Sequence, residues 1–96
     1  MHIGPEEMEQ LERRVAERDH VAFSTLHHAY AELIQRFVFT KMGNQSLARD
    51  MTARIFDQAW ERIDRYPWRD FSFHVWLLRI AREHVDALGG RPDRDF

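Results

Sequence analysis

The segment from Arg65 to Phe71, RYPWRDF, gathers aromatic and basic side chains around a single proline. Aromatic rings stack on unpaired bases and arginines neutralise phosphates, so this combination is typical of contacts with single-stranded nucleic acid. Two orientations of Trp68 are equally open: the indole faces outward, or it packs against Trp60 or Phe56. Tyr66 precedes the proline and is therefore extended, so bracing the turn is the alternative role for its ring.

Histidines and carboxylates are the other side chains that could support chemistry. The adjacent His27 and His28 cannot chelate one metal ion together, because neighbouring side chains on a helix point about 100° apart. No His-x-x-x-His pair occurs, and the sequence has no cysteine and no phosphate-binding glycine-rich loop. Asp50, Asp57 and Glu61 are better explained as one solvated helix face than as an acid–base pair. The sequence therefore predicts neither an enzyme, nor a metal site, nor a cofactor.

The elements that must position these side chains are all predicted to be helices. No stretch alternates apolar and polar residues as a half-buried strand would. Apolar residues instead recur every three or four positions over four segments, which indicates an all-α fold. The predicted helices span about 5–18, 19–42, 47–64 and 73–88.

Turn and cap residues mark the joints between these helices. Gly43 is a plausible cap for the end of the second helix. Either Asn44 or Ser46 is expected to cap the start of the third helix, and either Asp70 or Ser72 the start of the fourth. The chain therefore reads as a compact bundle of about four helices.

Length and composition are those of one small domain. The 96 residues are 44% hydrophobic, which is enough for a single core. We expect the domain to occupy 1–88, with 89–96 as a tail or the start of a linker. No apolar run approaches the roughly 18 residues of a membrane span, and no signal peptide is recognisable. The chain is therefore expected to be cytoplasmic and to make no membrane contact.

Charge is distributed unevenly along the chain, although the formal net charge is only −2. The first 20 residues carry six acidic and three arginine side chains. From 62 to 82 the balance reverses, with five arginines against two aspartates. Any anion-binding face should therefore lie in the second half of the chain.

Three blocks of sequence, AFSTLHHAY, ARDMTARIFDQAW and FSFHVWLLRIARE, occur in this order and spacing. Together they resemble region 2 of bacterial sigma-70-type factors, and most of all the small extracytoplasmic-function group. The most specific piece is the run from Phe73 to Arg82, and the resemblance extends over about 8–88. It implies an all-α region 2 fold that binds core RNA polymerase and recognises and melts the minus-ten promoter element.

The resemblance also implies two binding surfaces. One lies on the helix predicted over 47–64, which would dock on the clamp helices of the large polymerase subunit. The other lies on the loop and the last helix, which would contact promoter DNA, above all the melted non-template strand. The residues expected at the polymerase surface are Asp50, Arg54, Asp57 and Glu61. The residues expected at the DNA surface are Arg65, Trp68, Arg69, Asp70, Phe71, Arg79 and Arg82.

The sequence departs from the family pattern within the docking block. Ala53 and Arg54 stand where these factors commonly have Gln and Glu, and Glu83 replaces the usual Asn of the last helix. A guanidinium in place of a carboxylate reverses the charge offered to a basic partner. Two interpretations follow: a divergent sigma factor, or a sigma-like helical module that binds an anti-sigma factor or another regulator without DNA activity. The residues do not include the family's second, promoter-reading domain, so we expect a piece that ends at a linker.

Overall fold

The structure is a computed structural model in which residues 3–89 are described. These residues form four α-helices and one short 3-10 helix and contain no strand. The elements are α1 (Pro5–Ala16), α2 (His20–Met42), α3 (Gln45–Glu61), η1 (Ile63–Arg65) and α4 (Phe73–Ala87). The predicted all-α fold with four helices is therefore confirmed. The tail expected over 89–96 lies outside the described residues except for Gly89.

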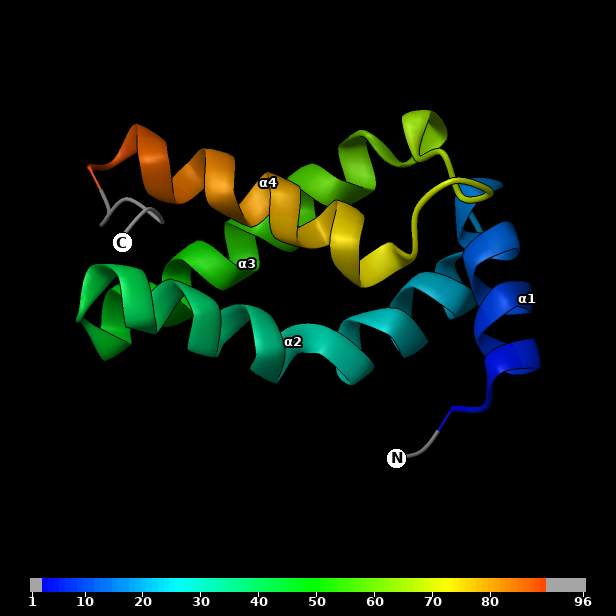
Figure 1. The fold of residues 1–96 in the computed structure, drawn as a ribbon, viewed down its shortest axis with the longest axis horizontal. Coiled ribbons are helices and arrows are strands. Elements are labelled where there is room, and N and C mark those ends of the chain that lie inside the picture. Colours follow the sequence, from blue (N-terminus) through cyan, green and yellow to red (C-terminus); the bar gives the residue numbers. More distant parts are fainter. Residues whose placement is uncertain (1–2, 90–96) are drawn as a thin grey trace.

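The helices are arranged so that the long α2 contacts each of the other three (Figure 1). α3 and α4 pack together along α2, and α1 lies across the end of the bundle beside the start of α2. The chain between η1 and α4 passes close to α1 in the same picture, and η1 contacts α1 directly. The loop predicted to bind nucleic acid is therefore held at the end of the bundle that α1 closes.

One continuous hydrophobic core joins all four helices. Phe73, at the start of α4, is fully buried, and its ring meets Phe23 of α2 edge-to-face, with 6.3 Å between ring centroids. Such edge-to-face pairs are favourable beyond the area they bury. Leu77 and Ile80 are also buried, whereas Trp76 is only partly buried. The first turns of α4 are thereby fixed against α2, and the loop that precedes them starts from a rigid base.

Helix ends follow the local sequence signals in most places. Gly43 ends α2 in the left-handed conformation, with φ of 72°. The Asn44 side chain accepts a hydrogen bond of 2.8 Å from the amide of Leu47 at the start of α3. The third helix ends at Glu61 and not near 64, because the following residues tighten into η1.

The start of α4 differs from the expected capping. Ser72 occupies the N-cap position, but its side chain makes no capping hydrogen bond. The Phe73 amide donates instead to Oε2 of Glu12, which lies on α1, at 2.8 Å. The Glu12 side chain, from another helix, thus caps the start of α4 in place of Asp70 or Ser72, the two residues expected there.

Candidate functional site

The loop between η1 and α4 is closed by hydrogen bonds between its own residues. The Tyr66 hydroxyl donates to the carbonyl of Phe71 at 2.8 Å, across the whole loop. The amides of Asp70 and Phe71 both donate to the carbonyl of Pro67, at 2.9 and 3.1 Å. Tyr66 is only 4% exposed, so its ring braces the turn, which is the alternative role that its place before the proline left open. The loop is a defined surface and not a slack connection.

The two remaining loop aromatics are oriented differently. Phe71 is 38% exposed, and the guanidinium of Arg79 lies 5.1 Å from the centre of its ring. Trp68 is partly buried against the core, with the Arg69 guanidinium 5.1 Å from its ring. Within the described residues no ring contact joins Trp68 to Trp60 or Phe56, the two packing partners considered from the sequence. Phe71 is therefore the ring offered to solvent, and Trp68 lies at the boundary between core and surface.

The arginines predicted to face DNA are all exposed. Arg65 ends η1, Arg69 lies in the loop, and Arg79 and Arg82 project from α4. Arg79 and the loop come together through the ring of Phe71. Arg79 and Arg82 also line a groove of about 480 Å³ between α4 and Phe37 of α2. The structure thus brings the loop and the first half of α4 into one surface, which Arg82 extends along the helix.

Glu12 is a residue of this region that the sequence prediction missed. It is only 8% exposed, and it joins α1 to the start of α4 through the amide of Phe73. Burial, and then the charge of Glu12, raise the pKa of the Tyr66 hydroxyl, which therefore stays protonated as a donor to Phe71. One signal could have revealed it: Glu12 lies four residues after Met8, on the apolar face of its helix.

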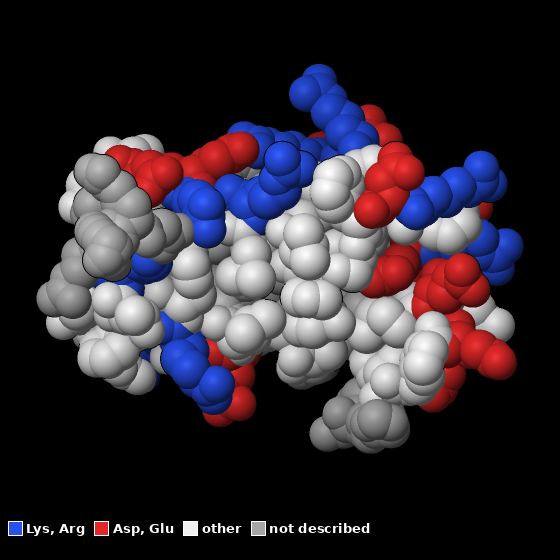
Figure 2. Space-filling model, in the orientation of Figure 1, with Lys and Arg blue, Asp and Glu red and all other residues white. Residues whose placement is uncertain are grey.

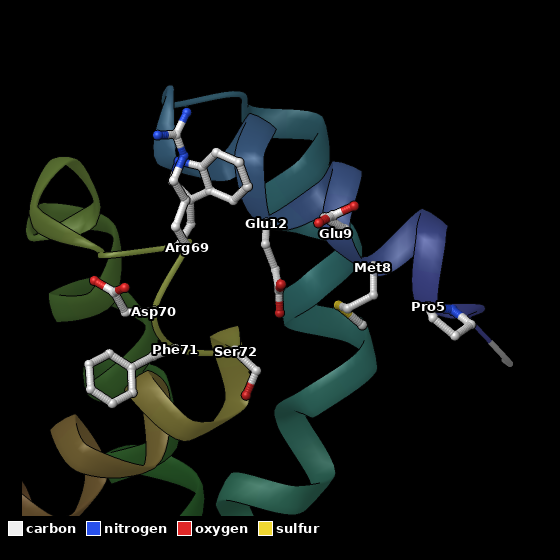
Figure 3. Close-up of a pocket in the computed structure, with 9 residues that line it drawn as sticks. Pro5, Met8, Glu9, Glu12, Arg69, Asp70, Phe71 and Ser72 are labelled. Carbon is white, nitrogen blue, oxygen red and sulfur yellow. The ribbon is translucent and has the colours of Figure 1, made fainter.

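A groove of about 580 Å³ separates α1 from the loop (Figure 3). The Glu12 carboxylate points from α1 into this groove, whereas Asp70 and the Phe71 ring point away from α1. The lining residues are Pro5, Met8, Glu9, Glu12, Trp68, Arg69, Asp70, Phe71 and Ser72. The loop is therefore supported from one side and open on the other.

The four residues predicted to meet the polymerase lie on one face of α3. Asp50, Arg54, Asp57 and Glu61 are all exposed. Within the described part of the chain, none of their charged groups forms an ion pair. We call this set the α3 ridge. It is separate from the loop, since none of its side chains lines the groove beside α1.

A second residue missed from the sequence, Arg18, ties the α1–α2 turn to the end of the α3 ridge. It has a left-handed backbone, with φ of 63°, which is uncommon for a residue other than glycine. Its guanidinium donates to the carbonyl of Glu61 at 3.4 Å and lies 3.6 Å from the carboxylate of Asp64. It also lies 5.3 Å from the centre of the Trp60 ring. The C-terminal end of α3 is thereby fixed to the turn between α1 and α2.

Charged side chains lie at the rim of the face seen in Figure 2. Acidic side chains lie over α1 at one end of the molecule, and both basic and acidic side chains lie along the edge that carries α4 and the loop. A broad uncharged area lies between them and extends toward α2. Among residues 3–89, no three histidines or carboxylates are grouped as metal ligands, and no helix is long and apolar enough to cross a membrane.

Comparisons with known proteins agree with the three sequence blocks. The family model described as Sigma-70 region 2 matches residues 26–87, which include most of α2 and all of α3 and α4. Among curated proteins, the chain is similar to the ECF RNA polymerase sigma factor BldN of Streptomyces coelicolor, with 34% identity over 79 residues. The alignment covers 81% of this chain and 29% of that relative, so the chain spans less than a third of the relative's length. No solved structure matches the chain.

Proposed function

This chain belongs to the sigma-70 region 2 family, in its extracytoplasmic-function group, and on that premise we propose that it joins core RNA polymerase to the minus-ten promoter element. Sigma factors are initiation factors, so the chain acts by binding and not by covalent catalysis. The observation that carries the DNA part is the exposed Phe71 ring, on a braced loop and beside Arg79.

The DNA surface would work by capturing bases that have left the duplex. An exposed aromatic ring stacks on an unpaired base with about 1–3 kcal/mol. Arg79 lies beside that ring, Arg65 ends η1 and Arg69 lies in the loop. These guanidinium groups would neutralise neighbouring phosphates. Since duplex bases are already stacked, such a surface favours the open strand over the closed duplex. It would therefore hold the melted non-template strand after the promoter opens.

The α3 ridge supports the polymerase part. Its four charged groups are exposed and have no ion-pair partner in the described residues. Ions that have no partner among residues 3–89 can pair with a complementary partner surface. Asp50, Asp57 and Glu61 would meet basic residues of the clamp helices, and Arg54 would need an acidic or uncharged neighbour there.

The DNA proposal is tested by fluorescence anisotropy with single-stranded DNA carrying non-template promoter sequences, at several salt concentrations. We expect binding that weakens as salt rises, with log Kd changing by about 0.7 per log salt for each phosphate contacted. Duplex DNA of the same sequence is the control and should bind more weakly. A folded sample with no affinity for any single strand would contradict the proposal.

A regulator-binding module without DNA activity is the second candidate. The exposed Arg54 favours it, because this guanidinium replaces the carboxylate that is common in the docking block. Such a module would bind an anti-sigma factor or another regulator and would show no salt-dependent affinity for promoter DNA. The same titration therefore separates the two functions.

A further inference from the structure

The contact between Glu12 and Phe73 connects two helices that are far apart in the sequence. Glu12 Oε2 accepts the amide of Phe73 at 2.8 Å, across 61 residues, and its side chain is buried. A buried carboxylate is unfavourable unless it is hydrogen-bonded. The first amides of a helix have no partner within it and carry partial positive charge, so a carboxylate is well matched there.

The hydrogen bond between Glu12 and Phe73 lies close to Phe71, whose ring is exposed to solvent. The carbonyl of Phe71 is held by the Tyr66 hydroxyl, and the amide two residues later is held by Glu12. Phe71 therefore lies between two fixed points of the backbone, one from the loop and one from α1. Ser72, at the N-cap, makes no capping bond of its own. Without Glu12, the segment from Phe71 to Phe73 would lose its attachment on the α1 side.

We propose that Glu12 is a positioning residue for DNA recognition: it holds the start of α4 so that Phe71 and Arg69 are presented to an unpaired base. The inference rests on the proposed function and extends it to α1, which precedes the residues matched by the family model. Glu12 itself does not contact the DNA. It acts through the backbone of the loop.

Electrostatics and positioning predict opposite results when Glu12 is changed. Removing a carboxylate near a phosphate-binding surface should tighten DNA binding, because it removes repulsion. Removing the hydrogen bond should weaken binding, because the loop must then be ordered at the moment of association. The sign of the change therefore distinguishes the two effects.

The experiment compares Glu12→Ala, Glu12→Gln and Glu9→Ala with the wild-type chain in single-stranded DNA anisotropy. Glu12→Ala should raise Kd about five- to tenfold, the size expected for loss of a helix cap. Glu12→Gln keeps an acceptor oxygen and loses the charge, so its Kd should be equal to or below that of the wild type. Glu9→Ala, one turn earlier on α1, removes charge without a hydrogen bond and should not weaken binding. Equal or tighter binding by Glu12→Ala would overturn the proposal.

Glu12→Asp provides the same test if Glu12→Ala does not fold. Aspartate keeps the charge but is one methylene too short to reach the Phe73 amide, so it should also raise Kd. A folded Glu12→Asp protein with wild-type Kd would show that charge alone matters and would overturn positioning.

Amide hydrogen exchange separates this inference from the proposed function. If Glu12 holds the loop, exchange at Phe73 and its neighbours in the loop becomes faster in Glu12→Ala and stays slow in Glu12→Gln. If the wild-type chain binds no single strand, the proposed function fails, and with it the DNA role of Glu12, even where exchange shows that Glu12 orders the loop. If wild type binds but exchange is unchanged in Glu12→Ala, positioning is wrong while the proposed function stands.

Discussion

Phe71 and Phe39 are both phenylalanines with exposed rings, 38% and 42% respectively, but their surroundings differ. Phe71 lies on the braced loop beside the guanidinium of Arg79, whereas Phe39 lies on α2, near Gln35 and Arg36, away from the loop. Stacking on a base depends on the ring and on nearby phosphate-binding groups. The pair therefore allows a matched test of the loop ring.

Phe71→Ala should weaken binding to single-stranded promoter DNA by about 1–3 kcal/mol, the usual loss for one base–aromatic stack. Phe39→Ala removes a ring of the same kind and should leave Kd unchanged. Both Kd values come from anisotropy, and circular dichroism checks that both variants are folded. Equal Kd values for the two variants would remove Phe71 from the DNA surface.

Two histidines are expected to make stability fall at mildly acidic pH. Burial, together with the nearby charge of His28, lowers the pKa of His27, which stacks on Phe56 at 4.1 Å between ring centroids. Burial and then the charge of Arg62 lower the pKa of His84, which is hydrogen-bonded to Gln58. A pKa below 6.5 in the folded state means that the unfolded chain takes up protons first as pH falls. Folding is therefore favoured above pH 6.5 and loses stability below it.

The measurement is urea unfolding followed by circular dichroism at pH 7.5 and 5.5. The wild-type midpoint should be lower at pH 5.5, and the difference between the two values should shrink when His27 and His84 are both changed to glutamine. An unchanged difference would show that other groups set the pH dependence.

At the scale of helices and turns, Arg18 combines an unfavourable backbone with favourable side-chain contacts. Its left-handed conformation is one that glycine adopts without strain. Its guanidinium meanwhile contacts Glu61, Asp64 and Trp60. Most of these contacts are exposed, and exposed ion pairs contribute little to stability.

Arg18→Gly should therefore be more stable than Arg18→Ala, by about 1 kcal/mol in the free energy of unfolding. Both variants lose the side-chain contacts, but only glycine also loses the strain. Urea unfolding of the two variants gives the difference directly. An alanine variant at least as stable as the glycine variant would show that the turn is not strained.

Elements whose causes are local could be predicted from the sequence. The four helices follow from apolar spacing, and the ends at Gly43 and Asn44 follow from the conformations and hydrogen bonds that these residue types favour. The start of α4 could not be predicted, because its partner is Glu12 on another helix. Sequence spacing gives no information on which distant side chain will face a free amide.

The orientation of the loop aromatics shows the same limit at the candidate site. For Tyr66 the sequence leaves bracing the turn open as an alternative role, because the following proline restricts its backbone, and the hydrogen bond from its hydroxyl to Phe71 shows that role. Trp68 could not be assigned, since its position depends on how closely α1 approaches the loop. The sequence predicted which segment forms the candidate site and left the direction of its side chains to tertiary packing. The proposed roles of these residues remain predictions.

For the whole molecule, the loop and the α3 ridge form separate surfaces, so the two proposed activities should be separable. Changing both Asp57 and Glu61 to lysine reverses their charge and should abolish binding to core RNA polymerase or its clamp-helix fragment. The same variant should keep its affinity for single-stranded DNA. Pull-down and anisotropy on one protein sample provide the two readouts.

The matched control for this variant is Glu32→Lys, because Glu32 is an exposed acid on α2, away from the ridge. It should bind both partners as the wild type does. Full polymerase binding by the doubly reversed protein would contradict docking through the α3 ridge. Loss of DNA binding in the same protein would show that the two surfaces are coupled.

The separation of 61 residues between Glu12 and Phe73 has a consequence for the newly made chain. The ribosome releases α1 early, and the amide that Glu12 holds is added only when α4 begins. Contacts between residues so far apart in the sequence form late, because packing of the core must first offset the entropy lost on closing the intervening chain. The loop therefore becomes ordered only once α4 has been made, and a chain released before α4 is complete carries Arg69 and Phe71 without the contacts that position them.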